Sequence, residues 1–368
     1  MSDYKVFTVN PGSTSTKIAL FQGEKNLFSA NVSHDAKVLS KYKTLSEQLE
    51  YRKSTIEQLL EANQIDLEGM DACVGRGGGL LAMEGGTYEI DDLVLKHSIN
   101  AENGVIHPAC LGPSIAYEFA EKYHAKAFTV NPPDVDELQD LARMTGIKGV
   151  YRGVHLHALN LKETAIRHAE SMGKEYEECN FIVCHIGGGI SISAHCAGKM
   201  IDGFDIVGGE GPMAPTRCGS IAVADLLKYA EDKEIKTVRQ LCTRNGGFVS
   251  HLGISDAIEL TERAKNGDQY AQMLWNTMIY QIDTCIVSMA AVLHGKVDGI
   301  LLGGGMVHSK DLVSQITDTC GWIAPVSAYP GEFEMEAMAS GASRVLAGKE
   351  KVKKYSGVCR FRGFTFDE

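Results

Sequence analysis

The sequence lacks any apolar run long enough to cross a membrane, which needs about 18 consecutive apolar residues. Its opening residues, MSDYKVFTVN, also lack the apolar segment of a secretory signal. We therefore expect no membrane partner and a cytoplasmic protein.

Paired cysteines are also lacking. The chain has 10 cysteines, none in a CxxC pair, and most lie in apolar segments, such as Cys184 and Cys285. This usage is typical of reduced, buried thiols and disfavours a zinc site. His155 and His157 form an HxH pair without a third ligand nearby, which favours a structural or helix-terminal role.

We also expect no basic surface patch, because the formal net charge is −11 and the acidic residues are spread along the chain. Nucleic-acid partners need clustered Lys and Arg, so we expect none. A nucleotide stays possible, since backbone N–H groups and a metal ion can bind its phosphates.

Two standard nucleotide-binding loops are absent from the first glycine turn, NPGSTSTK (10–17). A P-loop needs glycine directly before the lysine, where this chain has Thr16, and GxGxxG does not occur there. The turn is neither of these loops.

Three turns rich in glycine or hydroxyls are nevertheless present, each after an apolar strand: 10–17, HIGGGIS (185–191) and LGGGMVHS (302–309). One such turn alone is most simply a hairpin. Three of them favour a phosphate-binding role, because glycine lets backbone N–H groups approach an anion and hydroxyls add donors.

The residue pattern predicts alternating strands and helices, with the same order starting twice. Residues 5–22 and 181–196 each read as strand, turn and strand, and we expect two βββαβα halves. The expected strands are 4–9, 17–22, 26–33, 71–79, 125–131, three within 180–203, and one opening 297–316. The expected helices are 43–63, 112–124, 134–146, 154–173, 268–294, the second half of 297–316, and 332–348.

Eight motifs follow one another along the chain. They are NPGSTSTK (10–17), VGRGGGLLAMEGGTYEI (74–90), HPACLG (107–112), HALN (157–160), CHIGGGISISAH (184–195), GEGPMAPTRCG (209–219), LLGGGMVHS (301–309) and YPGEFEMEAMASG (329–341). Together they resemble the motifs of the acetokinase family, within the acetate and sugar kinase/Hsp70/actin superfamily. Within that family, the stretches EGGTYEI and GEGP favour the branch that acts on butyrate.

The resemblance implies an α/β protein with a two-lobed, actin-like ATPase (ribonuclease H-like) fold and a nucleotide cleft between the lobes. Residues 1–150 with about 333–368 would form the N-terminal lobe, and 151–332 the C-terminal, nucleotide-binding lobe. The implied protein is a homodimer that uses ATP and Mg²⁺.

The implied reaction is reversible transfer of the γ-phosphoryl group of ATP to a short-chain fatty acid, with butyrate first. The partners would be the carboxylic acid and ATP or ADP. Acetate, propionate or a branched-chain acid is the alternative substrate. A nucleotide-gated regulatory or binding module without acyl transfer is a further alternative.

A carboxylate acceptor is already an anion, so such a reaction needs positioning and charge stabilisation rather than a general base. Arg76 would bind the acyl group, while Arg217 and His185 would stabilise the phosphoryl group. His107 matches another family histidine, although a helix-entry role explains it nearly as well.

The three turns would bind the nucleotide, and a carboxylate would accompany the metal ion. Asn131 stands where the family usually has aspartate, which leaves Mg²⁺ without that charge unless Asp134 or Asp136 compensates. The first two turns would grip the phosphates, and the third would lie by the adenosine. The implied nucleotide-binding residues are Asn10, Gly12, Ser13, Ser15, Lys17, Gly187, Gly188, Gly189, Gly303, Gly304 and Gly305. The implied metal-linked residues are Asn10 and either Glu332 or Glu334.

Overall fold

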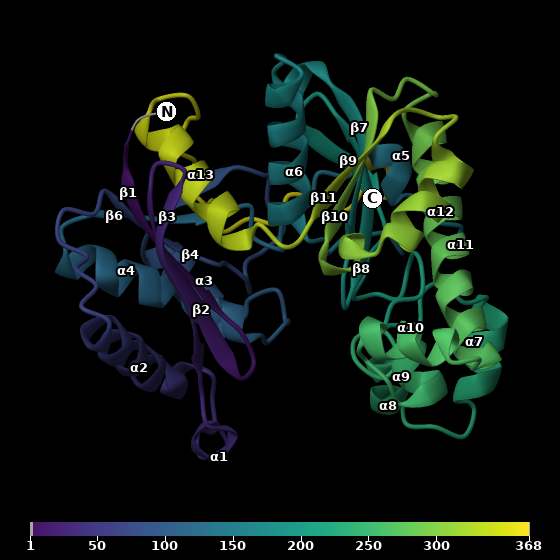
Figure 1. Cartoon of the computed structure of the whole chain (residues 1–368), viewed down its shortest axis with the longest axis horizontal. Helices are drawn as coiled ribbons and strands as arrows, with labels where there is room; N and C mark the ends of the chain where they lie inside the picture. Colours follow the sequence, from purple (N-terminus) through teal and green to yellow (C-terminus); the bar gives the residue numbers. More distant parts are fainter. Residues whose placement is uncertain (1–2, 368) are drawn as a thin grey trace. The chain divides into compact units, whose positions relative to one another are not determined.

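The computed structural model describes residues 3–367 and divides the chain into two compact units (Figure 1). Unit 1 runs to Asp136 and includes Phe333–Phe364. Unit 2 comprises Glu137–Glu332 and the residues from Thr365.

Unit 1 is built on a six-stranded sheet with the order β3-β2-β1-β4-β6-β5. β1, β2 and β3 form an antiparallel meander, β4 lies parallel to β1, and β6 lies parallel to β4. The strands are β1 Lys5–Pro11, β2 Ser15–Gln22, β3 Lys25–Ser33, β4 Ala72–Gly75, β5 Thr87–Glu89 and β6 Lys126–Val130.

Helices pack on this sheet because strand and helix side chains share one apolar core. Phe7 of β1 meets Phe119 of α4 edge to face, with ring centroids 5.4 Å apart. The helices are α1 Ala36–Leu39, α2 Leu49–Ala62, α3 Asp92–Asn100, α4 Gly112–Lys122 and α13 Glu334–Leu346.

Unit 2 repeats the strand order around a five-stranded sheet, β11-β10-β7-β8-β9. β7, β8 and β9 form the meander, β10 lies parallel to β7, and β11 lies parallel to β10. The repeated order of strands that the sequence predicted is therefore confirmed. The strands are β7 Asn180–Ile186, β8 Ile190–Cys196, β9 Lys199–Gly203, β10 Gly299–Gly304 and β11 Val326–Pro330.

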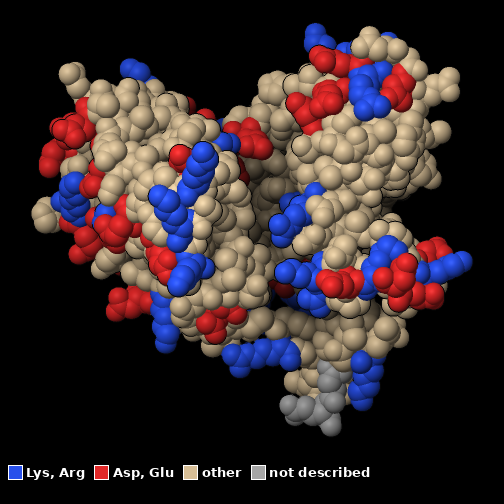
Figure 2. All heavy atoms as spheres, turned by 90° about the horizontal axis from the view of Figure 1, so that it is seen from below, with Lys and Arg blue, Asp and Glu red and all other residues tan. Residues whose placement is uncertain are grey.

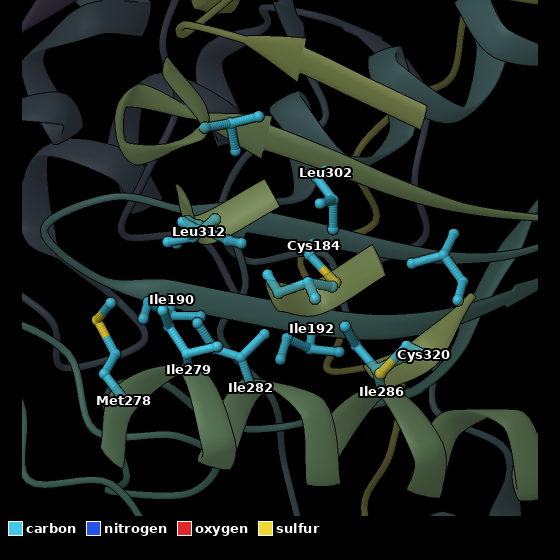
Figure 3. Close-up of a cluster of buried hydrophobic side chains, with 14 of the residues drawn as sticks. Cys184, Ile190, Ile192, Met278, Ile279, Ile282, Ile286, Leu302, Leu312 and Cys320 are labelled. Atoms are coloured by element: carbon cyan, nitrogen blue, oxygen red, sulfur yellow. The ribbon is translucent and has the colours of Figure 1, made fainter. Parts of the chain in front are cut away.

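The long helix α11, Gln269–Val292, lies against this sheet. Figure 3 shows Ile279, Ile282 and Ile286 of α11 pointing toward Ile190 and Ile192 of β8. Burial of these side chains joins the helix to the strands that carry the second glycine turn. The other helices are α5 Asp140–Arg143, α6 Ala158–Ser171, α7 Val223–Ala230, α8 Ile235–Gln240, α9 Gly247–Leu252, α10 Ala257–Lys265 and α12 Lys310–Cys320.

The helix predicted over 134–146 is wrong, since only α5 is helical there. The preceding residues form a turn and irregular backbone, and Val135 makes an isolated parallel bridge with Met83. The acidic side chains that would have formed the solvent face of a helix are buried instead. Glu137, for example, accepts hydrogen bonds from Lys162 Nζ at 2.8 Å and Met200 N at 2.9 Å.

The first boundary between the units falls between Asp136 and Glu137, earlier than the residue 150 of the sequence-based division. The contacts of Glu137 explain this position, as does the hydrogen bond from Gln139 N to Ile201 O at 2.9 Å. Both join this segment to the strands of unit 2.

The surface carries charges of both signs. On the face drawn in Figure 2, Lys and Arg side chains alternate with Asp and Glu over short distances. Among the described residues, no helix combines the length and apolar character needed to span a membrane.

Candidate active site

The first glycine turn joins β1 to β2 in unit 1. Gly12 N donates to Ser15 O at 2.7 Å and closes the turn. Ser13 is exposed at its tip and Ser15 is half-buried, while Lys17 is exposed on β2. The turn thus presents hydroxyl groups at one end of the sheet.

Three predicted site residues from distant parts of unit 1 meet beside this turn. Asn10 lies near the end of β1 that leads into the turn. Arg76 directly follows β4, and Glu334 is the first residue of α13. Asn10 Nδ2 donates to Glu334 Oε2 at 2.6 Å, and Arg76 Nε lies 3.8 Å from Glu334 Oε1. The alternative acid, Glu332, belongs to unit 2.

Arg76 is a buried cation, with a side chain 8% exposed. Burial lowers the pKa of Arg76, and the nearby carboxylates of Glu334 and Asp134 oppose this change. A guanidinium in this setting suits bidentate contact with a carboxylate or phosphate.

Asn131 has a backbone role that the sequence did not reveal. Its φ is +39°, a left-handed conformation that asparagine adopts more readily than most residues. Its Oδ1 accepts from Gly86 N at 2.7 Å, and its carbonyl accepts from Arg76 Nη1 at 3.3 Å. Asn131 therefore holds a turn and supports Arg76.

His107 caps the short 3₁₀ helix Pro108–Leu111, since its Nδ1 accepts from Ala109 N at 3.1 Å. The helix-entry role is thus observed. His107 is exposed at the surface, but desolvation by its neighbours lowers its pKa, and the positive charges of Arg76 and Arg52 lower it further, which favours a neutral imidazole.

The second glycine turn, residues 187–189, joins β7 to β8 in unit 2, with His185 near the end of β7. His185 is 4% exposed. Its ring stacks on that of His157, with centroids 4.1 Å apart, and its Nδ1 lies 3.5 Å from Asn160 Nδ2. Two residues of the HALN motif thus orient His185.

Arg217 lies directly over this turn. Its guanidinium occupies the space that a side chain at Gly189 would need. Thr216 Oγ1 donates to Gly188 O at 3.2 Å and ties the arginine segment to the turn. Burial lowers the pKa of Arg217, while the Asp205 carboxylate opposes this change.

Arg217 also has unused donors. Its Nε and Nη1 are buried, and neither has a hydrogen-bond partner among residues 3–367. A buried charged donor without an acceptor is costly, so this arrangement suits an anionic ligand.

A cavity of about 1080 Å³ in unit 2 contains the ends of both remaining glycine turns. Gly187 and Gly188 line it from the second turn, and Gly305 from the third. Gly304 instead allows close packing, because a side chain there would collide with the Ile186 backbone of β7, and Gly303 is buried within β10. Further lining residues include Asp256, Lys265, Trp275, Asp311 and Glu332.

Sequence reasoning missed two residues of these sites. His157 was assigned a structural role, although HALN had been noted as a motif. Arg52 was not singled out, yet its guanidinium donates hydrogen bonds to the backbone carbonyls of the β1–β2 turn. Its position, four residues before buried Ile56 and eight before buried Leu60, was the available signal.

The carboxylates and imidazoles of the described chain form no cluster of three or more that could hold a metal ion by itself. Glu334 places a carboxylate beside the Asn10 amide, near the first turn. A cation here would take much of its coordination from its ligand or from water.

Comparison with known proteins gives a consistent result. The acetokinase family model matches residues 147–319. Butyrate kinase 2 of Clostridium acetobutylicum is 42% identical over 358 residues, which cover 96% of this chain and 99% of that protein.

Solved structures show the same fold at low sequence identity. Acetate kinase of Entamoeba histolytica has a TM-score of 0.74 at 17% identity and covers 93% of this chain and 100% of its own. Acetate kinase of Porphyromonas gingivalis has a TM-score of 0.71 at 18% identity, with the same coverage. The extent of the match to the Clostridium protein shows that this chain belongs to the acetokinase family.

Proposed function

We propose that the chain transfers the γ-phosphoryl group of ATP to the carboxylate of a short-chain fatty acid, with butyrate as the preferred substrate. A carboxylate oxygen forms the new bond to phosphorus as the bond to the β-phosphate oxygen breaks, which gives butyryl phosphate and ADP. The identity to a butyrate kinase supports this reaction.

The single observation that carries the proposal is the pair of buried donors of Arg217. Its buried Nε and Nη1 have no acceptor among the described residues, and its guanidinium lies against the Gly189 backbone. The transferring phosphoryl group supplies the acceptor oxygens and the negative charge that this cation requires.

Arg76 takes the carboxylate end of the acid substrate in this proposal. Its burial beside Asn131 and Glu334 fixes the guanidinium before the substrate binds. Less conformational entropy of the arginine side chain is therefore lost when the substrate binds. His185, held between His157 and Asn160, donates to the phosphoryl group, and neutral His107 lies near Arg76.

ATP is assigned to the unit 2 cavity and to the first turn. The cavity has the size of a small-molecule site and combines the two glycine turns with apolar side chains such as Trp275 and Met306. Backbone N–H groups of the turns and the hydroxyls of Ser13 and Ser15 are the proposed phosphate donors.

Mg²⁺ is the proposed metal, and the donor set of unit 1 fits it. Mg²⁺ is usually held by one or two carboxylates together with substrate phosphates and waters. Glu334 supplies a carboxylate and Asn10 an amide oxygen, since Asn10 uses its Nδ2 toward Glu334. Bound there, the ion would neutralise phosphate charge, while Asn10 and Glu334 orient its waters.

A panel of acids tests both the reaction and the substrate. We expect ATP-dependent acyl phosphate, trapped as the hydroxamate, with the highest kcat/KM for butyrate among linear and branched acids of two to five carbons. The kcat/KM values of two acids that differ by one methylene should differ by about 10- to 200-fold at most, because one methylene contributes about 1–3 kcal/mol. A maximum at acetate would reassign the substrate, and ADP release that ignores every acid would favour a nucleotide-gated binding module.

We also propose a cytoplasmic location and a homodimer. All ten cysteines are free thiols, which supports a reducing compartment. The homodimer rests on the family resemblance, together with exposed apolar side chains on α11 of unit 2.

A further inference from the structure

Arg52 of α2 is completely buried although it carries a charge, with 0% of its surface exposed. Four of its hydrogen bonds reach the β1–β2 turn or its edge. Nη1 donates to Gly12 O at 2.9 Å, Ser15 O at 3.4 Å and Thr16 Oγ1 at 3.2 Å, and Nη2 donates to Ser13 O at 3.3 Å. Nε donates to Gln48 of its own helix at 3.1 Å.

These bonds fix the direction of the peptide groups in the turn. In a trans peptide the C=O and the next N–H point in opposite directions. Because the carbonyls of Gly12 and Ser13 point at Arg52, the N–H groups of Ser13 and Thr14 point away from it. Neither of these N–H groups donates to an atom of the described residues.

Arg52 is also a buried charge without a neutralising partner. Its acceptors are carbonyl, amide and hydroxyl oxygens, and it forms no ion pair with a carboxylate of residues 3–367. Burial lowers the pKa of Arg52, which reflects the cost of holding this charge away from water. Apolar packing alone would not require such an expensive group.

We propose that Arg52 is a positioning residue that presents the Ser13 and Thr14 N–H groups to the phosphates of ATP. Its own charge is partly balanced by those phosphates when the nucleotide binds. This inference rests on the proposed kinase function, because that function brings the nucleotide phosphates to the first turn. The arginine itself does not touch the reacting atoms.

Lysine cannot replace arginine in this role. A guanidinium has five N–H donors in a planar fork, and the turn uses both of its terminal nitrogens. An ammonium group keeps the charge but concentrates its donors at one point. Arg52→Lys therefore separates the geometric contribution from the charge, and Arg52→Met removes both.

Ile56→Ala is the matched control. Ile56 lies one helical turn after Arg52 on α2, is 0% exposed and belongs to the unit 1 core. Its truncation destabilises the same helix and lowers the melting temperature without removing a donor from the turn.

The experiment compares melting temperature, the Kd for ATP, and the kcat and KM values for ATP and butyrate in wild type and these three variants. We expect Arg52→Lys to raise the Kd and KM for ATP about tenfold or more, the cost of a lost charged hydrogen bond, with KM for butyrate nearly unchanged. Ile56→Ala should lower the melting temperature and leave KM for ATP near that of wild type.

Two outcomes would overturn the inference. One is an Arg52→Lys enzyme that loses stability like Ile56→Ala but keeps the wild-type constants for ATP. The other is an equal change in KM for both substrates. If Arg52→Met does not fold, Arg52→Ala with added methylguanidinium replaces it, and recovery of ATP affinity is expected. Wild-type inactivity toward every acid would refute the proposed reaction instead, while the ATP-binding comparison would still judge Arg52.

Discussion

At the scale of single residues, the site of unit 1 depends on groups that the chain brings together from far apart. Asn10 and Glu334 are separated by most of the sequence, yet they share a hydrogen bond of 2.6 Å. The motifs indicated both residues. Their contact could not be predicted, because it depends on how α13 returns to the first sheet.

The choice between Glu332 and Glu334 shows what sequence cannot decide. The two acids lie in one acidic stretch, and a shift of register by two residues exchanges them. In the structure the unit boundary runs between them, so Glu332 lines the unit 2 cavity and Glu334 contacts Asn10. Two acids that are only two residues apart in the sequence therefore belong to different units.

Glu334→Gln should therefore be the more damaging of the two matched substitutions. We expect it to lower kcat about 100-fold and to raise the Mg²⁺ concentration needed for half-maximal rate, because it removes the carboxylate beside the proposed metal site. Glu332→Gln should change kcat less than threefold and act mainly on KM for ATP. Mg²⁺ titrations of both variants measure this, and the reverse order would refute the metal assignment.

Arg52 was missed for a physical reason. Arginine on an amphipathic helix is usually solvated, and its neighbours Tyr51 and Lys53 are polar or amphipathic. Only its spacing from Ile56 and Leu60 placed it on the buried face. Residues that support a site through the backbone carry no chemical signature of their own.

At the scale of elements, the strands of the two meanders were predicted well because their apolar runs are short and bounded by turn residues, whereas β5 and β11 were not predicted. The strands of both meanders lie where the pattern placed them. The helix over 134–146 failed because its acidic residues find buried partners, as Asp134 does with Asn103 Nδ2 at 2.6 Å. Tertiary partners of that kind override a helical pattern.

The junction of β4 and α4 gives a test at this scale. A Cβ at Gly112 would collide with the carbonyl oxygen of Arg76, although Gly112 has ordinary helical φ and ψ. Gly112→Ala should destabilise the protein by roughly 3 kcal/mol despite the better helix propensity of alanine, and it should lower kcat by moving Arg76.

Denaturant unfolding with parallel activity measurements checks this effect. Gly146→Ala is the control, because its Cβ would meet no atom within 4 Å and its φ is not positive. Equal stability of the two variants would show that the close approach at Gly112 does not position Arg76.

At the scale of the whole molecule, the repeated strand order explains why the glycine turns recur. In each unit the turn that follows the first strand of the meander carries the candidate phosphate donors. The duplication was visible in the sequence as strand–turn–strand patterns. The position of the first boundary was not, because the segment after Asp136 joins unit 2 by buried ion pairing and strand contacts.

The proposed homodimer is tested on α11. Met273, Tyr280 and Val287 recur every seven residues on its outer face and are 62%, 67% and 39% exposed. A partner chain that covers this stripe would bury apolar surface. Light scattering should give twice the mass of one chain for wild type and a single-chain mass for Tyr280→Glu at low micromolar concentration. A wild-type mass of one chain would contradict the dimer.

The central proposal is that buried Arg76 of unit 1 and Arg217 of unit 2, whose Nε and Nη1 are buried, serve phosphoryl transfer between ATP and a fatty acid. Its most direct test is the rate of ATP-dependent butyryl hydroxamate formation by wild type, Arg76→Ala and Arg217→Ala, with folding checked by circular dichroism. The account predicts robust formation by wild type and a loss of about 100-fold or more in each variant. Near-normal rates in both folded variants would contradict it.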